Sequence, residues 1–133
     1  METDFNELIG KTLTAIDIND SRDEIRFICS DGTVYKMYHD QDCWESVSIE
    51  DITGDLDDLI GSEIIESEES TEECKECSDS GTWTFYKLAT SKGYVTIRWL
   101  GESNGYYSES VTFERGMKGV EIYETKWSLY NVR

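Results

Sequence analysis

The strongest constraint in this sequence is a set of short segments that occur twice in the same order. WESVSIE at 44–50 resembles SESVTFE at 108–114, and the tripeptide Leu-Ile-Gly occurs at 8–10 and again at 59–61. Between them, two hairpin-like segments also correspond, at 26–38 and 85–99. An unbroken order of matches is typical of a tandem repeat. We therefore predict two related units, spanning approximately residues 3–52 and 54–116.

The pattern inside each unit predicts a short helix, a strand, a hairpin and a further strand. Apolar residues alternate with polar ones in segments such as EIRFIC at 24–29, as expected for strands with one buried face. Each Leu-Ile-Gly would close a short amphipathic helix, with the glycine as its C-terminal cap. The predicted fold class is α+β: mostly antiparallel β-structure with short helices, and a pseudo-twofold axis relating the two units.

The rest of the chain is predicted to complete a single domain over 1–133. Residues 67–81 are acidic, small and polar without apolar periodicity, which favours a flexible acidic loop. Residues 117–133 have no counterpart in the first unit and are predicted to form a C-terminal extension that supplies an edge strand and a cap. The pattern leaves both a monomer and a homodimer open.

Charge is the most unusual property of the composition. The chain carries 29 acidic and 12 basic residues, for a formal net charge of −17. Nucleic acids and membrane surfaces are anionic, so direct binding to either is not expected. The N-terminus lacks the basic and apolar regions of a secretory signal, and no apolar run is long enough to span a bilayer, so we expect a soluble, cytoplasmic protein.

Much of the acidic charge lies in the middle of the chain, and two interpretations of it are open. It either keeps the protein soluble or imitates a nucleic-acid backbone and occupies a partner with a basic nucleic-acid-binding surface. The acidic residues assigned to such a partner surface are Asp55, Asp57, Asp58, Glu63, Glu66, Glu68 and Glu69.

A second candidate site lies around the two Glu-Ser-Val segments, each of which follows a loop with aromatic residues. If a twofold axis relates the units, these loops meet and form either a small-ligand pocket, for example for a nucleotide signal, or an anchor patch for a protein. The alternative is that the aromatic residues fill the two ends of the core. The residues assigned to this site are His39, Asp42, Cys43, Trp44, Glu45, Ser46, Asn104, Tyr106, Tyr107, Glu109 and Ser110.

Catalytic and metal chemistry have weak support, so no catalytic residue and no cofactor is assigned. A metal or thiol enzyme using His39 and Cys43 is conceivable, but no oxyanion nest or third catalytic member is recognisable. Cys74 and Cys77 have the spacing of half a zinc site and are weak metal candidates, since no second ligand pair is evident. Cys29 alternates into the apolar face of its strand and is expected in the core.

The segments HDQDCWESV at 39–47 and ESNGYYSESV at 102–111 carry a resemblance to a known family. Over residues 5–114 the chain resembles small acidic proteins of unknown function found in bacteriophages and prophages. The resemblance implies a phage-encoded protein in the cytoplasm of a bacterial host, where small acidic proteins often inhibit host defence or nucleic-acid-processing proteins. It implies no catalytic residues, because the family has no established activity.

Overall fold

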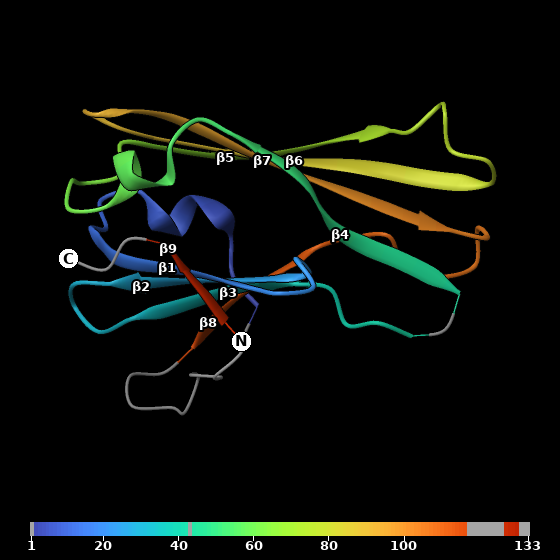
Figure 1. Cartoon of the computed structure of the whole chain (residues 1–133), viewed down its shortest axis with the longest axis horizontal. Coiled ribbons are helices and arrows are strands. Elements are labelled where there is room, and N and C mark those ends of the chain that lie inside the picture. Colours follow the sequence, from blue (N-terminus) through green and yellow to red (C-terminus); the bar gives the residue numbers. More distant parts are fainter. Residues whose placement is uncertain (1, 43, 117–126, 131–133) are drawn as a thin grey trace.

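A computed structural model, which describes residues 2–42, 44–116 and 127–130, shows two layers of antiparallel strands. Figure 1 shows the layers lying over one another, with the two short helical segments at one end. The elements are η1 (Phe5–Leu8), β1 (Leu13–Asn19), β2 (Glu24–Cys29), β3 (Val34–Tyr38), β4 (Glu45–Thr53), η2 (Leu56–Leu59), β5 (Glu66–Glu73), β6 (Ser80–Thr90), β7 (Gly93–Ser103), β8 (Thr112–Gly116) and β9 (Trp127–Tyr130).

The predicted α+β class is wrong, and the helix–strand–hairpin–strand unit is not found in that form. In the described part of the chain the only helical segments are η1 and η2, each a four-residue 3-10 turn. Apolar residues three positions apart, Phe5 with Leu8 and Leu56 with Leu59, lie on one face of such a turn and are buried. Gly10 then adopts a positive φ, which redirects the chain toward β1 before an α-helix can form.

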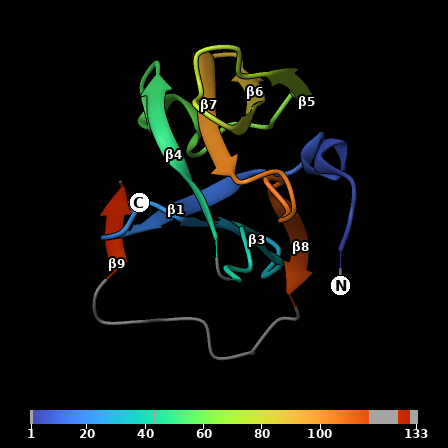
Figure 2. The same ribbon diagram turned by 90° about the vertical axis from the view of Figure 1, so that its right-hand side faces the viewer.

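Each sheet takes its fourth strand from the other half of the chain. The first sheet has the order β8-β3-β2-β1-β9 and the second has the order β4-β7-β6-β5. Figure 2 shows the two sheets as an upper and a lower layer, with β4 beside β7 in one and β8 beside β3 in the other. The first three strands of each half therefore stay together, while β4 and β8 are exchanged.

Two backbone hydrogen bonds connect the halves directly, where each 3-10 turn ends. The Gly10 N–H donates to the Ile64 carbonyl at 2.8 Å, and the Gly61 N–H donates to the Leu13 carbonyl at 2.9 Å. The two donors, Gly10 and Gly61, lie 51 positions apart, and so do the two acceptors, Leu13 and Ile64. The two bonds therefore occupy equivalent places in the two halves. These bonds hold the starts of the two sheets together.

The segment predicted to be a flexible acidic loop, 67–81, is largely ordered. Residues 66–73 form β5, which pairs with β6 along its full length at the edge of the second sheet. Backbone pairing with a neighbouring strand needs no apolar side chains, and charged residues are common on edges because they discourage further pairing. Beyond β5, Cys74 and Cys77 form a disulfide.

The C-terminal extension contributes β9, which pairs antiparallel with β1 as an edge strand. The other residues of the predicted extension, 117–126 and 131–133, lie outside the described part of the chain.

One buried cluster fills the space between the two sheets. Its aromatic members include Phe5, Tyr35, Tyr86 and Phe113, and the rings of Tyr35 and Phe113 are stacked with centroids 5.2 Å apart. Trp99 is fully buried, and its indole N–H donates to Met37 Sδ at 3.1 Å. Both exchanged strands supply residues to this cluster, so the core depends on both halves.

Candidate functional site

The two Glu-Ser-Val segments meet at one end of the molecule because of the strand exchange. Glu45 begins β4 and is paired with Ser103 at the end of β7. The chain then turns through residues 104–111 into β8, so Glu109 lies close to this end of the second sheet. Glu45 and Glu109 thus meet the same strand, β7, through Ser103.

Glu45 is the centre of a buried polar network. Its side chain is 1 % exposed, and Oε2 lies 3.0 Å from His39 Nε2 and accepts the Asp42 N–H at 2.6 Å. The other ring nitrogen, His39 Nδ1, lies 2.7 Å from the Ser110 carbonyl oxygen. Since a carbonyl and a carboxylate are both acceptors, the network is fully satisfied when both ring nitrogens carry hydrogen. It joins the start of β4 to the segment before β8.

Glu109 is surrounded by hydroxyl groups instead. Ser103 Oγ donates to Oε2 at 2.5 Å, and Thr82 Oγ1 donates to Oε1 at 2.7 Å. Burial raises the pKa of Glu109, but hydrogen bonds from Ser103, Ser80 and Thr82 outweigh it, so that the pKa is lowered. The carboxylate is therefore charged at neutral pH while half-buried.

The two networks occupy corresponding places and differ in one partner. Glu109 lies 64 positions after Glu45, and Ser103 lies 64 positions after His39. An imidazole ring thus accompanies the first carboxylate, and a hydroxyl group accompanies the second. The first carboxylate is enclosed with its buried ring partner, whereas the hydrogen-bond partners of the second in 2–42 and 44–116 are hydroxyl groups.

A cleft of about 350 Å³ opens beside Glu109. Its walls come from the inner side of β5 and β6 and from the connection before β8, and they are rich in hydroxyl groups. The lining residues are Glu69, Thr71, Ser80, Thr82, Thr84, Gly105, Tyr107, Glu109, Ser110 and Val111. We call this the Glu109 cleft.

Only three of the residues assigned to the ligand pocket line this cleft: Tyr107, Glu109 and Ser110. His39 and Glu45 are buried in their own network. Exposed residues that do not line the cleft are Asp42, Trp44, Ser46, Asn104 and Tyr106. Trp44 is 66 % exposed and does not fill the end of the core. Cys43 lies outside the described residues.

The acidic residues assigned to a partner surface fall into two groups. Glu66, Glu68 and Glu69 lie exposed on β5. The remaining members lie around η2, and of these Asp55 has a structural role, because its side chain accepts the Asp57 N–H and caps the turn. Asp55 also lines a separate hollow of about 460 Å³. The group around η2 comprises Asp55, Asp57, Asp58 and Glu63.

The cysteines offer little chemistry in this state of the protein. Cys74 and Cys77 are joined in a disulfide, so neither has a free thiolate for a metal. Burial raises the pKa of the Cys29 thiol to about 12, which leaves it unreactive in the core, as expected. Within the part of the chain that the structure describes, no three His, Cys, Asp or Glu side chains are grouped to hold a metal ion.

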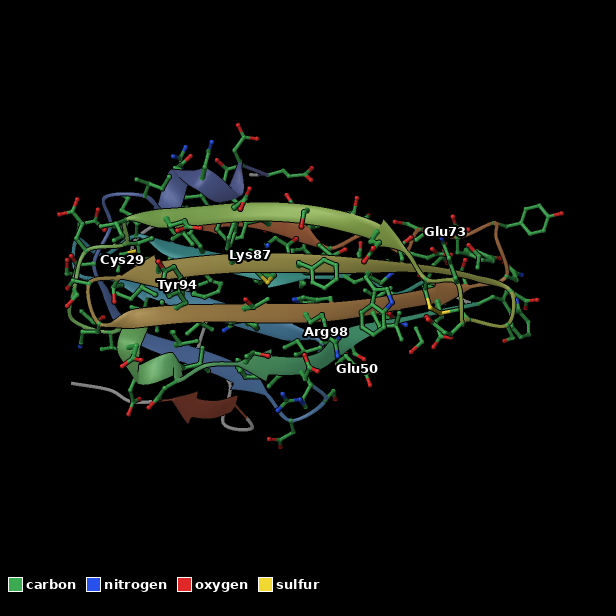
Figure 3. The ribbon with its side chains drawn as sticks, turned by 90° about the horizontal axis from the view of Figure 1, so that it is seen from above. Cys29, Glu50, Glu73, Lys87, Tyr94 and Arg98 are labelled. Carbon is green, nitrogen blue, oxygen red and sulfur yellow. A yellow bond between two sulfur atoms is a disulfide. The ribbon has the colours of Figure 1, made fainter. Side chains whose placement is uncertain are left out.

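The outer face of the second sheet carries a cluster that was not predicted from the sequence. Trp83 and Phe85 are stacked with ring centroids 6.4 Å apart, and the Arg98 guanidinium lies 4.6 Å from the Trp83 ring. Arg98 also pairs with Asp51 on β4 at 2.5 Å, and Figure 3 shows it on the upper face of the sheet with Tyr94 and Lys87. The alternation in TWTFYK at 82–87 signals this face, since every second residue points away from the core.

Together, fold and site define a small acidic protein made of two packed antiparallel sheets, with a polar cleft at one end. A family model described as a domain of unknown function (DUF7448) matches residues 6–113. The chain therefore belongs to that family, and the match covers almost the same residues as the resemblance seen in the sequence. No curated protein and no solved structure matches the chain. In the residues that are described, no helix is long and apolar enough to cross a membrane.

Proposed function

We propose that this chain is a non-enzymatic binding protein whose partner is a protein with a basic, nucleic-acid-binding surface. The observation that carries the proposal is β5, an edge strand with exposed carboxylates on both of its faces. Its sequence, ESEESTEE, contains five glutamates and no base. An edge strand of this kind presents a line of negative charge to whatever approaches the sheet from that side.

The charge density of β5 is of the order needed to imitate a nucleic acid. Eight residues of antiparallel strand extend about 27 Å. Five carboxylates over that length give about one charge per 5 Å, compared with about one per 3.4 Å along a single strand of DNA. A partner that binds phosphates through Lys and Arg side chains would meet a similar field here.

The wider setting belongs to the same proposal. The sequence resemblance to phage and prophage proteins favours a phage-encoded inhibitor in the bacterial cytoplasm, acting on a host defence or nucleic-acid-processing protein. The two groups of acidic residues, on β5 and around η2, would then be used together or separately, depending on the shape of the partner.

Capture from a bacterial lysate tests this proposal. The wild-type protein is compared with a variant in which Glu66, Glu68 and Glu72 are changed to Gln, and with a control that carries Glu50→Gln and Glu102→Gln. All five residues are exposed. We expect the wild type and the control to capture nucleic-acid-binding proteins, to release them to added duplex DNA and at raised salt, and the β5 variant to capture far less. Equal capture by the β5 variant, or capture unaffected by DNA, would overturn the proposal.

A small-ligand binding protein is the second candidate, and the Glu109 cleft favours it. A cleft of about 350 Å³ lies within the size range of ligand sites. A nucleotide signal fits less well, because the described residues that line the cleft include the carboxylates of Glu69 and Glu109 and no Lys or Arg. A thermal-shift series with nucleotides measures this directly, and we expect no stabilisation by anionic ligands.

A further inference from the structure

The Glu109 carboxylate is a half-buried charge that the described residues leave without a counter-ion. Its oxygens accept hydrogen bonds from Thr82 and Ser103, and no Lys, Arg or His within 2–42 and 44–116 forms an ion pair with it. Hydroxyl groups orient a carboxylate but do not cancel its charge. Removing such a charge from water carries a cost that a nearby cation offsets.

The corresponding carboxylate in the other half is enclosed by the protein and does not line the Glu109 cleft. Glu45 is almost fully buried and lies 3.0 Å from His39, which is itself buried. At the position of His39, the second half has Ser103, and the cleft opens beside Glu109. The buried imidazole partner of one half is thus replaced by a hydroxyl group and an opening to solvent in the other.

A second feature of the cleft points to a ligand independently of the carboxylates. Thr84 lines the cleft and is 2 % exposed, and no hydrogen bond of its hydroxyl to another described residue is found. The hydroxyl is not one of the fully buried unpaired atoms of the described residues, so water reaches it at the cleft and it is free to bind a ligand. The Thr84 hydroxyl can accept a hydrogen bond from an N–H group in the cleft, and the ring of Tyr107, another lining residue, is suited to contact with a cation.

We propose that the Glu109 cleft binds an organic cation, an alkylammonium or guanidinium group, with Glu109 as its counter-ion and Thr84 as an additional acceptor. Glu69, a second carboxylate in the lining and held at Oε2 by the Tyr86 hydroxyl, adds to the attraction. This inference deepens the proposed function, since it assigns a specific place for one Lys or Arg side chain of the basic partner. The same chemistry would accept a free polyamine or free arginine.

Titration calorimetry with defined probes tests the cleft on the full chain. The probes are spermidine, arginine amide and a short Arg- and Lys-containing peptide, with Ca²⁺ as an inorganic cation for comparison. We expect at least one organic cation to bind, and Glu109→Gln to weaken it by about tenfold or more, as loss of a partly desolvated charge partner does. Thr84→Val should weaken binding about threefold to tenfold, the effect of one lost hydrogen bond.

Binding of the small probes identifies a free metabolite as the source of the cation, and binding of the peptide alone identifies a protein partner.

Glu102→Gln is the control, because Glu102 is exposed on β7 and is not part of the cleft lining. Unfolding by heat verifies that each variant is folded. Unchanged affinity in Glu109→Gln, no binding of any organic cation, or equal binding of Ca²⁺ would overturn the inference. Failure of this inference can be told from failure of the proposed function. The variant with Glu66, Glu68 and Glu72 neutralised should still bind cations in the cleft, whereas Glu109→Gln leaves the charges of β5 unchanged.

Discussion

Replacing Glu45 with alanine should destabilise the protein more than any other single change of a carboxylate discussed above. The substitution leaves the His39 ring and the Asp42 N–H without their acceptor, and the His39 side chain is only 4 % exposed. Each buried donor that loses its acceptor costs about 1–3 kcal/mol, and here two donors lose theirs. For a chain of this size we expect the melting temperature to fall by about 10–20 °C.

Urea unfolding at neutral pH, followed by tryptophan fluorescence, measures the free energy of unfolding, since Trp99 is fully buried. Glu45→Gln is the conservative control: an amide oxygen in the place of Oε2 can still accept from the Asp42 N–H and from His39 Nε2–H, so we expect a loss of about 1 kcal/mol. Glu109→Ala is matched by position and should cost about 1–2 kcal/mol, because its hydroxyl partners border the cleft and regain water. A free energy of unfolding for Glu45→Ala within about 1 kcal/mol of that of the wild type or of Glu109→Ala would refute a structural role for the buried network.

Three further predictions concern the disulfide, pH and a glycine. Reducing Cys74–Cys77, or replacing both with Ser, should lower the free energy of unfolding by about 2 kcal/mol, measured by urea titration with and without reductant, because the loop that they close is short. The folded-state pKa of Glu109 is lowered, so the stabilisation that Glu109 contributes is complete above the unfolded-state pKa and is lost as the pH falls through the folded-state pKa. The difference in free energy of unfolding between the wild type and Glu109→Gln should therefore shrink in urea titrations at decreasing pH. Gly54→Ala should lower the free energy of unfolding by more than about 2 kcal/mol, because φ is +100° and a Cβ would overlap a carbonyl of β7. Gly105→Ala, at φ +96° but in open space, should lower it by about 1 kcal/mol, as measured by calorimetric melting.

Strand positions in this protein follow from alternation wherever one face of the strand is buried. EIRFIC at 24–29 and TWTFYKLAT at 82–90 are strands as predicted, because alternate side chains point inward and several of them, such as Phe27 and Tyr86, enter the core. The same argument fails for β5, whose exposed glutamates have no apolar period and whose pairing depends on the β6 backbone. Local pattern therefore identifies strands that bury side chains and misses an edge strand held by its neighbour.

Helical character was overestimated for a related reason. Phe5 and Leu8 are three positions apart, a spacing that an α-helical turn and a 3-10 turn both satisfy. The exchange of β4 and β8 was also beyond local pattern, because the pairing of Glu45 with Ser103 depends on the global arrangement of two sheets. Long-range pairing is a property of the whole packed chain.

The candidate site was predictable in part. Repetition of Glu-Ser-Val indicated that Glu45 and Glu109 could approach one another, and both meet Ser103 or its strand in the structure. The roles of their partners were not predictable, because whether His39 faces solvent or a buried carboxylate depends on the strand that covers it. The unpaired charge of Glu109 was likewise visible only once its neighbours were known to be hydroxyl groups.

The exchanged strands also constrain the order in which this protein can fold during synthesis. β3 pairs with β8, and residues that contact across this pair, such as Tyr38 and Glu114, are 76 positions apart. At about 5–20 residues per second, the ribosome needs several seconds to make the intervening chain. The β3 edge of the first sheet stays uncovered during that interval, so chaperone binding to nascent chains should end only after β8 has emerged.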